Sequence, residues 1–71
     1  MAALSERDKR MHSLGVGCDQ LNQALAAMHR AHGNLVFGGH RVHADRLARY
    51  IKRLDTWLFD LDREWSRLKG R

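Results

Sequence analysis

"LARYIKRLDTWLFDLDREWSRL", residues 47–68, decides the fold of this chain. Its large apolar residues recur at alternating steps of four and three, the heptad spacing of an amphipathic helix that packs along one seam. The seam residues are Leu47, Ile51, Leu54, Leu58, Leu61, Trp65 and Leu68. The chain has no proline to break this pattern, so we expect one long helix over about residues 40–69.

The first half of the chain carries a second seam with the same spacing. Its members are Leu4, Met11, Leu14, Cys18, Leu21, Leu25 and Met28. Ser5 followed by Asp8 has the spacing of a capping box, and Gly33 is a candidate glycine cap. These signals predict a helix over about residues 5–32 and a loop over about 33–39. The chain is therefore expected to be a single all-α domain, an antiparallel two-helix hairpin.

The two seams also predict a register. With Leu4 facing Leu68, every seam residue meets an apolar partner. The remaining pairs are Met11–Leu61, Leu14–Leu58, Cys18–Leu54, Leu21–Ile51, Leu25–Leu47 and Met28–Ala44. On one edge this register also pairs Arg10 with Glu64, Gly17 with Trp57, Ala24 with Tyr50, and Ala31 with His43. We therefore expect Gly17 to make room for the Trp57 indole, whereas Gly15 is given no such partner.

A hairpin of this length has one seam and no second layer. A domain of 71 residues buries only about 60% of its unfolded surface, and its single cysteine cannot form an internal disulfide. Four aromatic residues would remain partly exposed: Tyr50, Trp57, Phe59 and Trp65. We expect them to form the interface of a homodimer, a four-helix bundle. The alternative is a loosely packed monomer that becomes ordered on a different partner.

Composition narrows the function classes. No apolar run approaches the ~18 residues of a membrane span. The N-terminal residues carry charges where a secretion signal is apolar, and a lone thiol favours a reducing compartment, so we expect a cytoplasmic protein. Cys18 falls on the seam, where burial makes a thiol inert. The glycines do not form a phosphate loop. We expect no enzymatic activity, no cofactor and no small-molecule substrate.

The stretch between the helices is unusually apolar. Leu35, Val36 and Phe37 lie between glycines, whereas turns favour polar or glycine chemistry. We expect at least one of the three to cover the end of the bundle. The others would anchor the tip in a pocket of another protein, with His40 and Arg41 as a polar rim. The favoured function is a small protein-binding regulator.

Four histidines gather at the same end of the hairpin. They are His29, His32, His40 and His43. Imidazoles one helical turn apart are weak candidates for a zinc site, because structural zinc sites usually contain cysteine. Ordinary surface histidines are the favoured interpretation.

A basic stripe on the second helix supports an alternative function. Its members are Arg46, Arg49, Lys52, Arg53, Arg63 and Arg67, interrupted by Asp60. With a net charge of +5, such a stripe could bind the phosphates of DNA or RNA. No known nucleic-acid-binding motif is present. A second alternative is a structural subunit of an assembly.

In size, lack of catalytic residues and hairpin-dimer design, the chain resembles the small regulators and inhibitors that bacteriophages make. Anti-activators of transcription factors and anti-CRISPR proteins are examples. The resemblance implies an inhibitor of a bacterial regulatory protein. It concerns architecture alone and assigns no residue a role.

Overall fold

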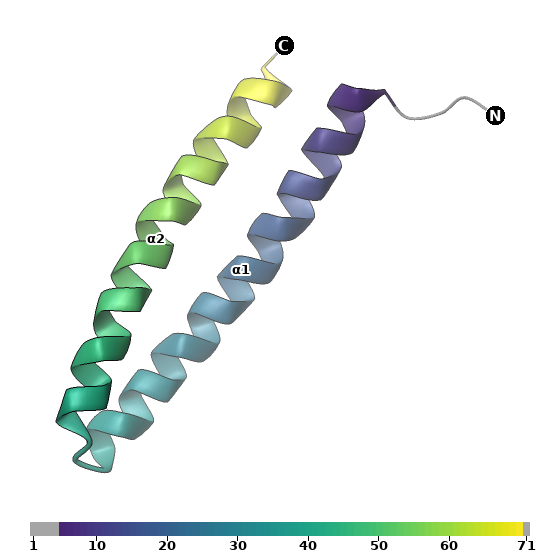
Figure 1. Cartoon of the computed structure of the whole chain (residues 1–71). Helices are drawn as coiled ribbons and strands as arrows, with labels where there is room; N and C mark the ends of the chain where they lie inside the picture. Colours follow the sequence, from purple (N-terminus) through teal and green to yellow (C-terminus); the bar gives the residue numbers. More distant parts are fainter. Residues whose placement is uncertain (1–4, 71) are drawn as a thin grey trace.

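The computed structural model describes residues 5–70, which form two long helices joined by a tight turn (Figure 1). Helix α1 spans Glu6–Phe37 and helix α2 spans Arg41–Lys69. The helices lie side by side and antiparallel, so the first turn of α1 and the last turn of α2 lie at the same end of the molecule (Figure 1). The molecule measures 56 × 22 × 12 Å, which is two helices wide and one helix thick. The predicted all-α hairpin is confirmed.

Helix α1 begins at the predicted cap. Ser5 has an extended backbone (φ −65°, ψ 160°), and its hydroxyl oxygen accepts a hydrogen bond from the Asp8 backbone N–H at 3.1 Å. Glu6 and Asp8 place negative charge in the first turn, where the helix dipole favours it. The start of α1 is therefore specified locally, by one polar side chain and two acidic ones.

The predicted seams are the least exposed positions of both helices. On α1 the half-buried seam residues are Met11, Leu14, Cys18, Leu21, Leu25, Met28, His32 and Leu35. On α2 the corresponding residues are Ala44, Leu47, Ile51, Leu54, Leu58, Leu61, Trp65 and Leu68. Only Ala44 and Leu58, at 2% and 7% exposure, are buried among the described residues. Leu4 lies outside the described residues. The seam prediction is confirmed, and α1 extends it to Leu35.

The predicted end of the first helix is wrong. Helix α1 continues through Gly33 to Phe37, and the expected loop over 33–39 shrinks to Gly38, Gly39 and His40. Gly39 has a φ of +79°, a left-handed conformation that glycine adopts without steric strain. The Gly39 N–H donates to the Val36 carbonyl and the His40 N–H to the Leu35 carbonyl, at 3.1 and 2.9 Å. These two bonds form a Schellman motif.

The physical reason for the longer helix is the seam itself. His32 and Leu35 are half-buried, so the extra turn covers more apolar surface of α2 than a loop would. A glycine inside a helix costs about 1 kcal/mol relative to alanine, which the additional packing and backbone hydrogen bonds offset at Gly33. The helix ends where Gly38 and Gly39 allow the chain to reverse.

The shorter turn also changes the register by one heptad. Counted outward from the turn, the seam residues pair Leu35 with Ala44, and at the open end Met11 with Leu68. The contact between Gly15 and Trp65 fits this register, whereas the predicted register would separate them by about two helical turns. The predicted pairs, such as Met11 with Leu61, are therefore wrong. A heptad pattern superimposes on itself after seven residues, so only the turn length selects the register.

The predicted contact between Gly17 and Trp57 is wrong for the same reason. A Cβ built on Gly17 has nothing within 4 Å. Gly15, which was expected to have no partner, instead has the Trp65 Nε1 atom at 3.3 Å from its hypothetical Cβ. In the corrected register the residues level with Trp57 and Tyr50 on this edge are Ala24 and Ala31. Each ring therefore still lies level with a small residue: Trp57 with Ala24 in place of Gly17, and Tyr50 with Ala31 in place of Ala24.

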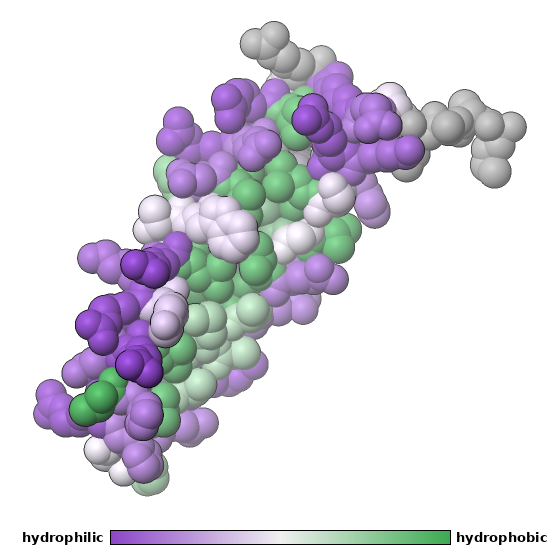
Figure 2. All heavy atoms as spheres, viewed as in Figure 1, coloured by the Kyte–Doolittle hydropathy of each residue, from purple (hydrophilic) through white to green (hydrophobic). Residues whose placement is uncertain are grey.

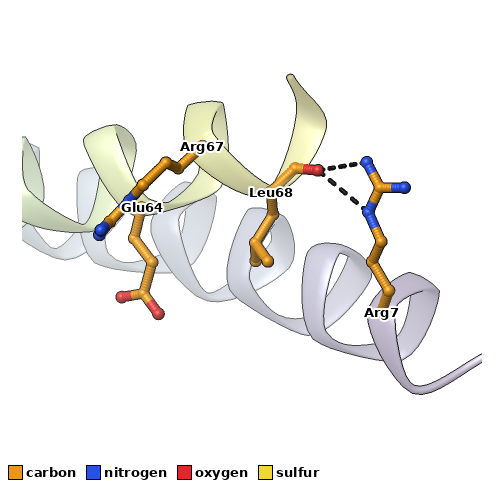
Figure 3. Close-up of a pocket in the computed structure, with 4 residues that line it drawn as sticks. All are labelled: Arg7, Glu64, Arg67 and Leu68. Atoms are coloured by element: carbon orange, nitrogen blue, oxygen red, sulfur yellow. Dashed lines mark hydrogen bonds between the residues drawn. The ribbon is translucent and has the colours of Figure 1, made fainter. Parts of the chain in front are cut away.

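The open end of the hairpin is joined by a side-chain hydrogen bond. The Arg7 guanidinium donates to the Leu68 carbonyl through Nε at 3.1 Å and also through Nη2 (Figure 3). This carbonyl belongs to the last turn of α2, where the helix dipole favours a cation. The first turns of α1 are thereby tied to the last turn of α2.

Candidate protein-binding tip and lateral face

The closed end of the hairpin presents an apolar tip. We define the tip as Val36, Phe37 and Val42 with the polar residues His40 and Arg41. Phe37 is 95% exposed, Val42 77% and Val36 55%. Three large apolar side chains thus face solvent where two helices meet, although burial of such groups is normally favourable. An exposed apolar cluster of this kind is typical of an interaction site.

The predicted loop residues divide into two roles. Leu35 is half-buried and closes the seam opposite Ala44, so it covers the end of the core as expected. Val36 and Phe37 point away from that seam, with His40 and Arg41 also exposed. Val42 was not predicted, because its position just after the glycines was assigned to the start of a helix. Its place outside the α2 heptad seam was the signal that it would be exposed.

The tip has a hydrogen-bonded backbone and carries no negative charge. The Schellman bonds fix the backbone on both sides of Gly39. From Asn34 to Ala44 the sequence contains no acidic residue, and Arg41 lies at the first position of α2. The tip therefore combines an ordered apolar surface with positive charge, which suits an apolar pocket with an acidic border.

A second exposed apolar surface runs along one broad side of the hairpin (Figure 2). We define this lateral face by the small residues on one edge of α1 and the two rings on the matching edge of α2. Its members are Gly17, Ala24, Ala27, Ala31, Tyr50 and Trp57. Both rings are 53% exposed. Figure 2 shows a hydrophobic strip along the groove between the helices, bordered by polar side chains.

The four aromatic residues expected at a dimer interface do not share one surface. Tyr50 and Trp57 lie on the lateral face. Phe59, 65% exposed, follows Leu58 on α2 and lies on a different side of that helix by the heptad geometry. Trp65 is half-buried in the seam, with the Lys69 Nζ atom 5.0 Å from its ring centre. Of these four residues, only Tyr50 and Trp57 therefore lie on one surface and could contribute to the same interface.

The basic stripe divides into two groups. Arg46, Arg49 and Arg53 surround Tyr50 and line a shallow groove with it. Arg63 and Arg67 line another surface together with Asp60, Asp62 and Glu64. Lys52 is exposed but does not line either groove.

The arginines around Tyr50 are not neutralised by an ion pair. Within residues 5–70, the single ion pair joins Lys9 Nζ to Glu6 at 3.9 Å. Three positive charges that form no ion pair are therefore concentrated around Tyr50, in the half of α2 nearer the turn.

The histidines occupy different environments. His32 is half-buried on the seam, whereas His29, His40 and His43 are exposed. Across the described part of the chain, no group of three or more histidine, cysteine, aspartate or glutamate side chains could hold a metal ion. Cys18 is half-buried on the seam, as expected from its heptad position.

Comparisons with known protein families, curated protein sequences and solved structures found no match to this chain. Neither described helix has an apolar stretch long enough to cross a membrane. Among the described residues, the tip, the lateral face and the arginines around Tyr50 are the surfaces suited to binding a partner.

Proposed function

We propose that this chain is a small, non-enzymatic protein-binding regulator that inserts its tip into an apolar pocket of a target protein and blocks it. The observation that carries the proposal is the exposure of Phe37, 95%, beside a turn closed by backbone hydrogen bonds. A ring in this position adds little to the folded core. It is available as an anchor, and aromatic anchors dominate the binding energy of many interfaces.

The hydrogen-bonded backbone of the tip supports the same proposal. A backbone that is already ordered loses little conformational entropy on binding, and such preorganisation favours affinity. Arg41 and His40 supply the polar rim. The resemblance to phage-encoded regulators gives the expected class of target, a cytoplasmic bacterial regulatory protein that is inhibited by the contact.

We also propose that the hairpin pairs with a second copy to form a four-helix bundle. Only two residues among those described are buried, and a hairpin one helix thick has no second layer to cover its broad sides. A two-fold dimer covers one side of both copies at once.

The tip is tested by quantitative affinity capture with three forms of the chain. We compare the wild type, Phe37→Ala, and Phe59→Ala as the control, since Phe59 is also an exposed ring but lies outside the tip. A bacterial protein retained by wild type and Phe59→Ala but lost with Phe37→Ala supports the proposal.

The purified partner then provides the quantitative measurement. A hot-spot residue contributes about 2 kcal/mol or more, so Phe37→Ala should raise the Kd at least roughly 30-fold. Equal affinity of Phe37→Ala and wild type for every captured protein contradicts the proposed role of the tip.

A second candidate function is nucleic-acid binding, favoured by the three arginines around Tyr50. Their test is binding to random duplex DNA across a salt series, since phosphate contacts give a steep salt dependence. Replacing Arg46, Arg49 and Arg53 with glutamine should abolish that dependence. The matched control replaces Lys52, Arg63 and Arg67, which removes the same charge from other positions. Equal effects of the two triple variants would indicate attraction by net charge only.

A further inference from the structure

We infer that the lateral face is the surface on which a second copy of this chain packs, and that the two copies pack antiparallel, with their tips at opposite ends of the dimer. The shape of the lateral face supports this packing. A two-fold interface uses the same patch on both copies, so the patch must fit itself. In the antiparallel arrangement α1 packs on α1 of the other copy and α2 on α2. The row of alanines lets the two α1 helices approach closely, and the exposed rings of the two α2 helices cover each other.

The area of the lateral face is large enough for a stable interface. The broad side of the hairpin measures 56 by 22 Å and offers an area on the order of 1,000 Å², above the ~800 Å² per partner that a stable interface typically buries. Tyr50 and Trp57 remain about half exposed in the single hairpin, and aromatic rings contribute strongly to interfaces. The opposite broad side carries the carboxylates of Asp19, Asp55 and Asp62, all exposed, which disfavour close packing of two copies there.

The distribution of charge along the lateral face selects the orientation. Arg46 and Arg53 border the lateral face in its half nearer the turn. Its half nearer the open end is bordered by Asp60 and Glu64, which line shallow grooves together with Arg67 and Arg10. Antiparallel packing lays α2 of one copy over α2 of the other in the reverse direction, which brings Arg46 and Arg53 against the half that carries Asp60 and Glu64. Parallel packing lays the half of α2 nearer the turn over residues 20–37 of α1, which contain no acidic residue.

The consequence is a divalent molecule, which rests on the proposed function of the tip. In an antiparallel dimer the two Phe37 side chains lie at opposite ends. Helix α1 has 32 residues and is about 48 Å long at 1.5 Å per residue, so the tips are separated by a distance on the order of 50 Å. Such a dimer fits two copies of a target protein, or two sites of one oligomer, and gains avidity from the second contact.

The test of the face uses one substitution at two neighbouring positions. Ala27→Glu places a charge on the lateral face, and Ala26→Glu places the same charge on an exposed position on the other side of α1. Sedimentation equilibrium of the wild type should give about twice the 8.2 kDa chain mass. Ala27→Glu should give the mass of one chain and Ala26→Glu that of two. Far-UV circular dichroism reports whether each variant remains helical.

A second pair of variants keeps the test valid if Ala27→Glu fails to fold. Trp57→Ala should raise the dimer dissociation constant at least about 10-fold, as expected for an interface anchor. Phe59→Ala should leave it within about 2-fold, as expected for a residue outside the interface.

The orientation is measured by electron–electron distances in a Cys18→Ala, Glu6→Cys chain that carries one nitroxide per copy. Antiparallel packing should give a separation well beyond about 40 Å, and parallel packing one near about 20 Å, from the helix rise and the spacing of packed helices. A monomeric wild type, a dimer that Ala27→Glu leaves intact, or the short distance overturns the inference. Loss of Phe37-dependent capture with an intact antiparallel dimer would instead contradict the proposed function of the tip.

Discussion

The Trp65 Nε1 atom lies 3.3 Å from the position that a Cβ on Gly15 would occupy. This contact joins the first third of α1 to the last turns of α2, so it reports how the two helices are aligned. It also explains why a glycine is present in a helix interior, where glycine is unfavourable by about 1 kcal/mol relative to alanine.

The two glycines of the segment from 15 to 17 should respond differently to alanine. Gly17→Ala adds a Cβ in open space and should raise the free energy of unfolding by about 0.5 to 1 kcal/mol, the gain in helix propensity. Gly15→Ala should gain less, because the Trp65 indole must move by a few tenths of an ångström. Urea unfolding of both variants measures the difference. A Gly17 variant less stable than the Gly15 variant would restore the contact between Gly17 and Trp57.

The end of α1 is tested by a second pair of glycines. Gly33→Ala should stabilise the protein by up to about 1 kcal/mol, because Gly33 is helical with nothing close to it. Gly39→Ala should destabilise it by about 1 kcal/mol or more, because alanine resists a positive φ. Thermal unfolding of the two variants provides the measurement. The reverse order would place the end of the helix at Gly33.

The core is tested by adjacent residues of α2. Leu58→Ala should lower the free energy of unfolding by about 2 to 5 kcal/mol, since Leu58 is buried. Phe59→Ala should change it by no more than about 0.5 kcal/mol, as for other exposed positions. Chemical unfolding followed by circular dichroism at a fixed protein concentration measures both. A large loss at Phe59 would show that this ring is buried in the assembled protein.

The cap of α1 gives a further prediction. Ser5→Ala removes the oxygen that accepts the Asp8 N–H and should lower stability by about 1 kcal/mol. Ser66→Ala, the control, changes an exposed serine within α2 and should be neutral or slightly stabilising, by up to about 0.5 kcal/mol. Equal effects at the two serines would contradict the capping role. Differential scanning calorimetry measures both midpoints.

The hairpin and its seams were predictable because they depend on periodicity. An apolar residue every three or four positions has one low-energy solution, a helix with a buried stripe, and two such stripes in a short chain pack on each other. The register was not predictable from the same pattern, since Met11 meets an equally apolar partner in Leu61 and in Leu68. The deciding feature was local: whether Gly33 or the pair Gly38 and Gly39 ends the helix.

The candidate sites were predictable to a lesser degree. An exposed Phe37 follows from three apolar residues beside glycines, and the unpaired arginines around Tyr50 follow from their spacing. Phe59 and Trp57 lie on different sides of α2. Predicting this required the angular position of each residue around the helix, measured from the seam. The exposure of Val42 depended on where the turn ended, which the sequence pattern left ambiguous.

The tight turn has a consequence for the length of the molecule. The turn at Gly38 and Gly39 sets the register of α1 against α2. The helices can therefore be longer or shorter at the open end without a change of register. Seven residues added to each helix at the open end would lengthen the rods by about 10 Å and leave every existing side chain in its angular position. A single added residue in the turn would instead rotate one helix by about 100° and expose its apolar stripe. Longer and shorter versions of this hairpin would therefore carry the same tip at different distances from the open end.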